Sequence, residues 1–458
     1  MPIDMRNRLL VGLLSLLVPA LAAADDPCLT GASLLGDQRA LVALRDATEA
    51  ACPCASYTGG AELNRGAYRK CARGVLDATI GSAGLRLECR STAQQDIKGA
   101  VCGAVGKVAC GRVRAEARTP ITCKVRPATR CTDRPGIDST ACTDQTYCSD
   151  VIDWTAGTCI DPRTNGPFGV GIRMITFTKQ SVVNPATPRP LDTLIWYPAP
   201  AGASPIEAGF GAVVDAPLDN SGGPYPILMF SHGSCAFPNQ SPFLTALLAS
   251  YGFIVVAPPH PGNTIFDFPA CGSTTNQVAS FQERPQDIIF VLDQMLAANQ
   301  DSGSPFFGTI DPSRIGMSGH SFGGLTTYLV VAADSRFKTA MPMAPAVLGN
   351  PVLSVPSLTM LGKIDAVVND DSIRHAYADA LPPKLLIEID NTGHYAFSNG
   401  CFPSPDCDPP VTLTQAEAHA QVLRWALPFL KVYLAGDDGF RPFLTDPAPP
   451  GATFSHQP

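Results

Sequence analysis

The chain contains the stretch Arg314-Ile-Gly-Met-Ser-Gly-His-Ser-Phe-Gly-Gly-Leu325, in which a short apolar run leads into a helical pattern. Its centre, Gly319-His-Ser-Phe-Gly323, has the form G-x-S-x-G. In this motif a strand turns sharply into a helix, and the serine at the apex stands clear of the backbone. Flanking glycines relieve the crowding in the turn, and the helix N-terminus favours negative charge beside the serine. We therefore predict that Ser321 is a nucleophile. The alternative is a glycine-rich turn that merely contains a serine.

On both sides of this turn, short apolar runs alternate with helical patterns over residues 161–440. Such alternation is typical of a mainly parallel sheet covered by helices. The expected strands are 170–178, 193–197, 227–230, 253–257, 315–318, 339–343, 358–361 and 384–389. The expected helices are 242–250, 286–299, 325–333, 372–380 and 414–430. Eight strands with the serine turn after the fifth predict an α/β-hydrolase fold. The chain beyond Lys431 is rich in Pro, Gly and Asp, so we expect a loose tail, assigned to 441–458.

An acyl-transfer serine needs a base, and in this fold the chain order is Ser, then Asp or Glu, then His. Of the histidines after the serine, His375 and His419 lie in expected helices, and His456 lies in the expected tail. His394 instead lies in a loop just after the last expected strand, where a catalytic imidazole belongs. We predict that His394 is the base, against the alternative of a surface-loop histidine.

The acid that orients the base is expected at Asp365, shortly after the seventh strand. The carboxyl ends of parallel strands are where reactive groups gather in open sheets. Asp370 and Asp371 are the alternatives, while Asp390 is too close in sequence to the predicted base.

The oxyanion that forms during acyl transfer needs two N–H donors. One is expected from the residue after the nucleophile, Phe322, and the other from the loop after the third strand, where Ser234 is our candidate. Two further histidines lie nearby but precede the nucleophile. We expect His232 to brace the loop and His320 to pack within the turn.

Residues 1–24 have the pattern of a secretory signal. Basic Arg6 and Arg8 precede an apolar run at 9–18, and small residues end at Ala24, where we expect cleavage. Elsewhere no apolar stretch reaches membrane-spanning length. The net charge of −7 gives no nucleic-acid signature. We expect a secreted or periplasmic protein without a transmembrane segment or nucleic-acid partner.

Twelve of the sixteen cysteines fall in residues 25–160, which predicts a separate, small, disulfide-rich and partly helical domain. Helical patterns cover 33–51, 68–80 and 94–110, and residues 119–159 resemble disulfide-held loops. A metal site is the alternative at Cys52-Pro-Cys54 and at Cys102 with Cys110. It would need thiolates alone, because the first histidine is His232. We favour disulfides and expect no metal and no cofactor.

Seven basic residues of this segment could form a surface that docks on a partner, although a solvated surface is the simpler interpretation. They are Arg65, Arg69, Lys70, Arg73, Arg112, Arg114 and Arg118. The four late cysteines predict the pairs Cys235–Cys271 and Cys401–Cys407, both bordering the site. The alternative is a free Cys235, with Cys271 paired to the N-terminal segment.

Residues from about 165 to 430 resemble a group of serine esterases. Pro226-Ile-Leu-Met-Phe-Ser-His-Gly233 and Ser250-Tyr-Gly-Phe-Ile-Val-Val-Ala257 are similar to platelet-activating-factor acetylhydrolases. The motif around Ser321, together with Ala344-Pro345, Val355-Pro-Ser-Leu-Thr-Met-Leu-Gly362 with Asp365, and Gly393-His-Tyr395, is similar to cutinase-like polyester hydrolases. Dienelactone-hydrolase-like proteins belong to the same group. The resemblance implies a carboxylic-ester hydrolase acting on short-chain, lipid-type or polyester substrates.

Two departures from these families stand out. The turn Met341-Pro-Met-Ala-Pro-Ala346 lacks the carboxylate that acetylhydrolases carry there, and polyester hydrolases have an aromatic residue where this chain has Ala346. Dienelactone hydrolases use a cysteine nucleophile, whereas this chain has Ser321. Outside the esterases, the alternatives are a binding or adhesion protein with a vestigial site and a serine peptidase, for which no gating cap domain is visible.

Overall fold

The structure is a computed structural model, and it describes most of the chain. The described residues are 28, 34–80, 85–114, 120–142, 152–153, 158–159, 163, 165–200, 212–400, 413–437, 440–445 and 452–457. The predicted signal at 1–24 and the predicted Cys401–Cys407 pair lie outside them. No helix within the described ranges is long and apolar enough to cross a membrane.

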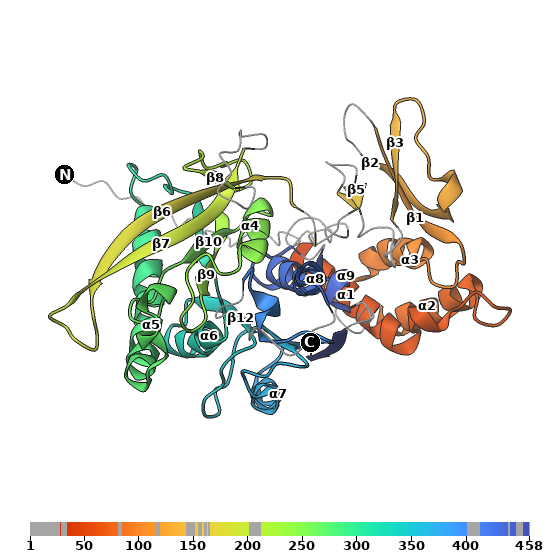
Figure 1. Ribbon diagram of the computed structural model, residues 1–458. Helices are drawn as coiled ribbons and strands as arrows, with labels where there is room; N and C mark the ends of the chain where they lie inside the picture. The colour runs from red at the N-terminus through yellow and green to blue at the C-terminus, as the bar shows by residue number, and fades with distance from the viewer. Residues whose placement is uncertain are drawn as a thin grey trace, which may run out of the picture.

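The described residues form one large sheet of ten strands, in the order β15-β14-β13-β12-β11-β9-β10-β7-β6-β8. Figure 1 labels β6 to β10 and β12 of this sheet. The strands are β6 (Gly169–Gln180), β7 (Pro188–Ala199), β8 (Ala212–Val214), β9 (Tyr225–Ser231), β10 (Ile254–Ala257), β11 (Ile310–His320), β12 (Phe337–Met343), β13 (Ser357–Gly362), β14 (Lys384–Ile389) and β15 (Ala452–Gln457). Six central strands, β9 to β14, run parallel, and β6, β7 and β15 pair antiparallel at the two sides. All eight expected strands and the α/β-hydrolase fold are confirmed, and β8 and β15 are additional edge strands.

Helices cover both faces of this sheet, which is why its central strands are continuous apolar runs. The helices are α4 (Pro242–Ser250), α5 (Thr274–Ala298), α6 (Phe322–Ala333), α7 (Asp370–Asp379), α8 (Gln415–Tyr433) and α9 (Pro442–Thr445). Apolar side chains of α4 and α8 build one core, and those of α5, α6 and α7 build the other. The expected start of α5 at residue 286 was wrong. The helix begins twelve residues earlier, capped by Ser273, and continues through Pro285.

The expectation of a loose tail beyond Lys431 was also wrong. Helix α8 continues to Tyr433, and the side chains of Phe440, Phe443 and Leu444 are buried in the core. Strand β15 pairs with β14 along its whole length, and the ring of Phe454 stacks on Trp425 with centroids 4.7 Å apart. These contacts are made with distant parts of the chain, so the local Pro and Gly content gave no sign of them.

The N-terminal part combines helices with a small sheet. Its elements are α1 (Leu34–Ala51), α2 (Arg65–Thr79), α3 (Arg90–Gly99), β1 (Lys107–Arg114), β2 (Pro120–Pro127), β3 (Ile137–Cys142), β4 (Ile152–Asp153) and β5 (Thr158–Cys159). The helix expected over 94–110 ends at Gly99, and Cys110 lies in β1. Residues 119–159 are not loops alone, because β2 and β3 flank β1 in a three-stranded sheet.

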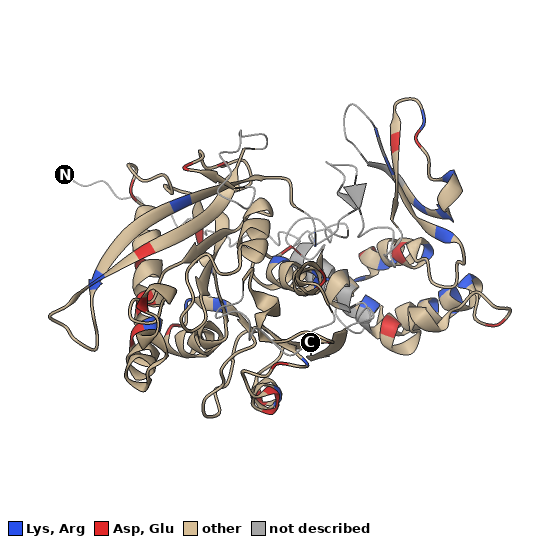
Figure 2. Cartoon of the chain, viewed as in Figure 1, with Lys and Arg blue, Asp and Glu red and all other residues tan. Residues whose placement is uncertain are grey.

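Disulfides staple this part, as the sequence predicted. The described pairs are Cys28–Cys89, Cys52–Cys71, Cys54–Cys102 and Cys110–Cys131. They occupy the cysteines for which a metal site was considered. Many Lys and Arg positions, coloured blue in Figure 2, lie along this part of the chain. The docking surface predicted from them stays a prediction, and Arg118 lies outside the described residues.

We expect the Phe454→Ala substitution to destabilise the protein by about 1–3 kcal/mol. The half-buried ring would lose its stacking on Trp425 and its contact with the core. Urea denaturation would measure the change. Gln457→Ala, at an exposed position of the same strand, is the control and should be nearly neutral. Equal effects of both substitutions would show that β15 contributes little to the fold.

Candidate active site

The turn between β11 and α6 holds Ser321 in a strained backbone conformation. Its φ of 58° and ψ of −116° lie in a region that residues with a side chain rarely adopt. Two glycines permit the turn. A Cβ on Gly319 would lie 2.3 Å from the carbonyl oxygen of Gly323, and a Cβ on Gly323 would lie 1.8 Å from that of Ser231. The G-x-S-x-G pattern therefore reflects close backbone packing on both sides of the serine.

The end of β12 fixes the backbone of the same turn. The Ser321 amide donates to the Met343 carbonyl at 2.9 Å, and the Ser321 carbonyl accepts from the Ala346 amide at 3.1 Å. The serine backbone is thus held from the neighbouring strand, which leaves its side chain to line the pocket described below.

His394 and Asp365 form a buried pair. The His394 Nδ1–H donates to Asp365 Oδ2 at 2.7 Å, and the two side chains are only 3% and 0% exposed. Asp365 Oδ1 accepts from the amides of Val367 and Val368 at 2.7 and 3.1 Å. This arrangement fixes the carboxylate and makes Nε2 the imidazole nitrogen that can accept a proton.

The alternative acids have other partners. Asp370 and Asp371 both face Arg374, at 3.6 and 3.0 Å, and Asp390 lies 2.6 Å from Lys363. None of the other late histidines bonds to Asp365 among the contacts of the described residues. His375 bonds to the Asp371 carbonyl, His419 to the Ser398 carbonyl, and the His456 ring stacks on Phe454.

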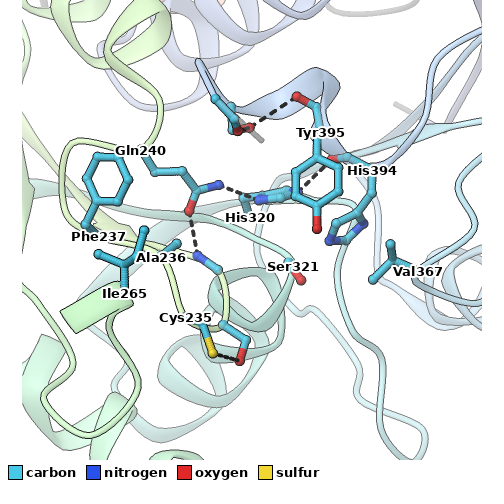
Figure 3. Close-up of a pocket in the computed structure, with 14 residues that line it drawn as sticks. Cys235, Ala236, Phe237, Gln240, Ile265, His320, Ser321, Val367, His394 and Tyr395 are labelled. Atoms are coloured by element: carbon cyan, nitrogen blue, oxygen red, sulfur yellow. Dashed lines mark hydrogen bonds between the residues drawn. The ribbon is translucent and has the colours of Figure 1, made fainter. Parts of the chain in front are cut away.

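Ser321 and His394 line one pocket of about 280 Å³ (Figure 3). Its lining residues are Gly233, Ser234, Cys235, Ala236, Phe237, Gln240, Ile265, His320, Ser321, Val367, His394, Tyr395, Ser398 and Gly400. The structure thus brings together three predicted site residues, Ser234, Ser321 and His394, with Asp365 behind the imidazole. Phe322 follows directly as the first residue of α6. Its amide has no carbonyl one turn earlier in the helix to bond with.

The loop after β9 faces the serine from the other side. Its Gly233 amide donates to Gln240 Oε1 at 2.7 Å, so this N–H is already engaged. The Ser234 hydroxyl accepts from the side-chain amides of Asn263, in the loop after β10, and Gln277, in α5. Ser234 therefore remains our candidate in this loop for the second oxyanion donor.

Arg284 supports this loop from beneath, and our sequence analysis missed it. The fully buried guanidinium donates to the carbonyls of His232 and Gly233 at 2.6 and 3.0 Å and to Asn263 Oδ1 at 2.6 Å. It also lies over the Phe322 ring, 4.5 Å from the centroid. Burial lowers the pKa of Arg284 to about 9, so the group is still a cation at neutral pH.

A signal for Arg284 was present in the sequence. It precedes Ile288, Val291 and Met295 at spacings of four, seven and eleven, so a charged residue occupies the apolar face of α5. A charge in such a position is rarely tolerated unless buried groups accept hydrogen bonds from it.

A second buried network lies beside Arg284. Ser231 Oγ is 2.9 Å from His260 Nε2, and His260 Nδ1 is 3.0 Å from Asp287 Oδ2. Arg189 binds the Asp287 carboxylate through two nitrogens at 2.8 and 2.7 Å. The side chains of His260 and Asp287 are 0% exposed, so this Ser-His-Asp arrangement has no access to a substrate and acts as support.

Gln240 and His320 connect the two loops that face the serine. Gln240 Oε1 accepts a hydrogen bond from the Gly233 amide, and Gln240 Nε2 bonds to His320 Nδ1. The His320 Nε2–H donates to the carbonyl of His394 at 2.8 Å. His232, on the other loop, bonds through Nδ1 to the Gly233 carbonyl. The expected bracing and packing roles of His232 and His320 agree with these contacts.

The predicted Cys235–Cys271 disulfide is confirmed, with sulfurs 2.04 Å apart. It ties the loop after β9 to the loop after β10, and Cys235 itself lines the pocket. The alternative of a free Cys235 is therefore wrong.

The strained serine follows a central strand of the sheet, and a His–Asp pair follows later in the chain. These features define the α/β-hydrolases that carry a nucleophile elbow. Comparison with known families narrows that class. The PET hydrolase-like family model matches residues 202–450, which is more than half of the chain. The chain belongs to this family.

Three curated proteins are similar to this chain. Platelet-activating factor acetylhydrolase of Cavia porcellus is 26% identical over 242 residues, covering 40% of this chain and 55% of that protein. Cutinase est1 of Thermobifida alba is 27% identical over 194 residues, with coverages of 41% and 59%. Bis(hydroxyethyl) terephthalate hydrolase of Streptomyces coelicolor is 23% identical over 242 residues, with coverages of 52% and 66%. The chain thus spans less than two thirds of each relative's own length.

We expect Gly323→Ala to destabilise the protein by about 3 kcal/mol, near the top of the range for an overfilled core. The new Cβ would lie 1.8 Å from the Ser231 carbonyl oxygen, so the turn and the end of β9 would have to separate. Gly272→Ala is the control, because a Cβ there meets nothing within 4 Å. Urea denaturation of both variants would measure the difference. Equal stability would mean that the turn can relax without cost.

We also expect the protein to lose stability as the pH falls below 6.5. Burial is the main cause that holds the pKa values of His232, His260 and His320 well below their ordinary 6.5. Protons therefore bind these groups more readily in the unfolded chain, and each histidine should cost about 1 kcal/mol at about pH 5.5. Urea denaturation at about pH 8 and about pH 5.5 would measure the loss.

A variant pair separates this effect from other titrations. His232→Asn should make the pH dependence shallower, whereas His375→Gln, at an exposed position, should leave it unchanged. An unaltered slope in His232→Asn would contradict the explanation.

Proposed function

We propose that the protein is a serine carboxylic-ester hydrolase that uses Ser321, His394 and Asp365 without a cofactor. The observation that carries the proposal is the buried His394–Asp365 pair, with His394 lining the same pocket as a serine in a strained strand-to-helix turn. This is the set of groups that acyl transfer needs.

The reaction follows from these positions. Ser321 Oγ attacks the ester carbonyl carbon while His394 Nε2 takes the hydroxyl proton. The amides of Phe322 and Ser234 donate to the oxyanion, and each such donor contributes roughly 3–4 kcal/mol to the transition state. His394 then gives its proton to the departing alcohol oxygen. Water, deprotonated by the same imidazole, releases the acid from the acyl-serine.

Short-chain or lipid-type esters are the substrates we propose. Polyester is a second candidate, favoured by the family match and by relatives named as cutinases and a terephthalate-ester hydrolase. Ala346, where polyester hydrolases carry an aromatic, weighs against polyester. Release of soluble products from a polyester film, compared with hydrolysis of p-nitrophenyl esters, would separate the two.

We also propose that residues 25–160 form a separate domain and that the protein matures after export. The disulfides support an oxidising compartment, where such bonds persist. Sequencing the N-terminus of the mature protein would test the cleavage site after Ala24.

We expect Ser321→Ala and His394→Ala to lower kcat by about ten-thousand-fold or more, because they remove reacting groups. Ser321→Ala should hardly change stability, whereas His394→Ala also leaves the buried Asp365 carboxylate without its partner and should be less stable. Asp365→Asn should cost a similar factor by misorienting the imidazole. Asp371→Asn is the matched control and should stay within about twofold. Hydrolysis of p-nitrophenyl butyrate would measure the rates.

A fluorophosphonate should label the wild-type protein at Ser321 and leave Ser321→Ala unlabelled, as read by mass spectrometry. Absence of labelling in a folded wild-type protein would favour the binding or adhesion function. More than a few per cent of activity in Ser321→Ala would mean that the nucleophile is another residue.

A further inference from the structure

A second hollow adjoins the candidate active-site pocket. It has a volume of about 600 Å³ and shares two lining residues, Phe237 and Ile265, with that pocket. Met174 on β6 and Leu194 on β7 lie opposite each other in the sheet register and line it together. Prolines and Phe266 from the loops after β9 and β10 complete its mostly apolar lining. We call this hollow the side groove.

The aromatic wall of the side groove is exposed yet fixed in place. Phe266 is 90% exposed, although it lies in a short 3-10 helix that Thr264 and Asp267 cap at its start. The Cys235–Cys271 disulfide ties the same loop to the loop beside Ser321. With the exposed Met174 and Phe237, which also line the side groove, Phe266 forms an exposed apolar surface of the kind that binds an apolar group.

The sizes of the two hollows limit what each can hold. The candidate active-site pocket, at about 280 Å³, is just below the range of about 300–1,000 Å³ typical of small-molecule sites. It suits the atoms around a scissile ester bond, while the side groove offers about twice that volume. A substrate long enough to pass Phe237 and Ile265 would occupy both.

The charged residues of the side groove determine which kind of substrate chain it can bind. The described residues that line it include two carboxylates, Asp192 and Asp267, and no Lys, Arg or His. Asp192 accepts from the Thr176 hydroxyl, and Asp267 accepts from Thr264 and Gly262. An anionic chain end would meet negative charge without a cation to pair with. An uncharged chain meets no such penalty.

We propose that the side groove binds the distal, uncharged aliphatic chain of the ester whose carbonyl carbon lies at Ser321. The proposal rests on the proposed function and makes the side groove the part of the site that selects for chain length. Each methylene buried there should raise kcat/KM by at most about fourfold.

Met174→Glu tests this selection, because the exposed Met174 tolerates a polar residue but would place a carboxylate in the side groove. Phe307→Glu is the matched control. Phe307 is similarly exposed, but it precedes β11, at the end of that strand opposite to Ser321. The measurement is kcat/KM for p-nitrophenyl acetate and p-nitrophenyl dodecanoate, each below its micelle concentration.

In Met174→Glu we expect at least about a tenfold loss on the dodecanoate and a change within about twofold on the acetate. Phe307→Glu should match the wild type on both. Equal losses on both esters, or no loss relative to Phe307→Glu, would overturn the proposal.

A binding measurement separates the groove from the reaction. In the full chain carrying Ser321→Ala, ethyl dodecanoate would displace the neutral dye Nile red. Adding Met174→Glu should weaken that displacement at least about fivefold, and adding Phe307→Glu should not. If the wild-type protein hydrolyses no ester but Met174→Glu still weakens the displacement, the proposed function is wrong and the binding of an aliphatic chain in the side groove is supported. Equal displacement in all three proteins would overturn the proposal. It would also be overturned if Met174→Glu weakened binding to phosphatidylcholine vesicles but left the displacement of the dye by ethyl dodecanoate unchanged.

Discussion

The contact between the serine turn and the end of β9 is the constraint on which the site depends. The backbone at Gly323 lies so close to the Ser231 carbonyl that no Cβ fits between them. This approach places the first turn of α6 against the loop that carries Ser234. One tight backbone contact therefore sets how close the nucleophile lies to the loop of Ser234, the second predicted oxyanion donor, and side chains then fix the orientation of that loop.

Buried polar side chains form a continuous framework that contacts the loops around the candidate active site. Arg284 holds the carbonyls of the loop after β9, and Asp287 and Arg189 neutralise each other beside it. Gln240 and His320 extend the framework to the carbonyl of His394. Buried charges are costly unless they are paired or hydrogen-bonded, and here the bonds converge on the loops that need a fixed position.

Patterns that are local in the chain made the sheet and the arrangement of the candidate site residues predictable. Apolar runs such as β9 (Tyr225–Ser231) are buried on both faces and can be recognised without a structure. Ser321, Asp365 and His394 each follow a strand, so the order of the strands brought them to one edge. The Cys235–Cys271 pair followed from an even cysteine count.

Features that depend on distant partners were missed. Strand β15 exists because β14 pairs with it, and the early start of α5 was hidden by Pro285, which has the appearance of a helix boundary. The bonds of Arg284 reach residues about fifty positions away.

Strand β15 also changes how the molecule meets its neighbours. Without it, β14 (Lys-Leu-Leu-Ile-Glu-Ile) would present an open row of backbone N–H and C=O groups beside aliphatic side chains. Such an edge readily recruits a strand from another molecule, which is a common route to aggregation. With β15 in place, the outermost strand on this side is Ala-Thr-Phe-Ser-His-Gln, a largely polar sequence. These six residues thereby replace an edge strand that would pair with other molecules by a polar one. The polar edge favours colloidal stability at high protein concentration.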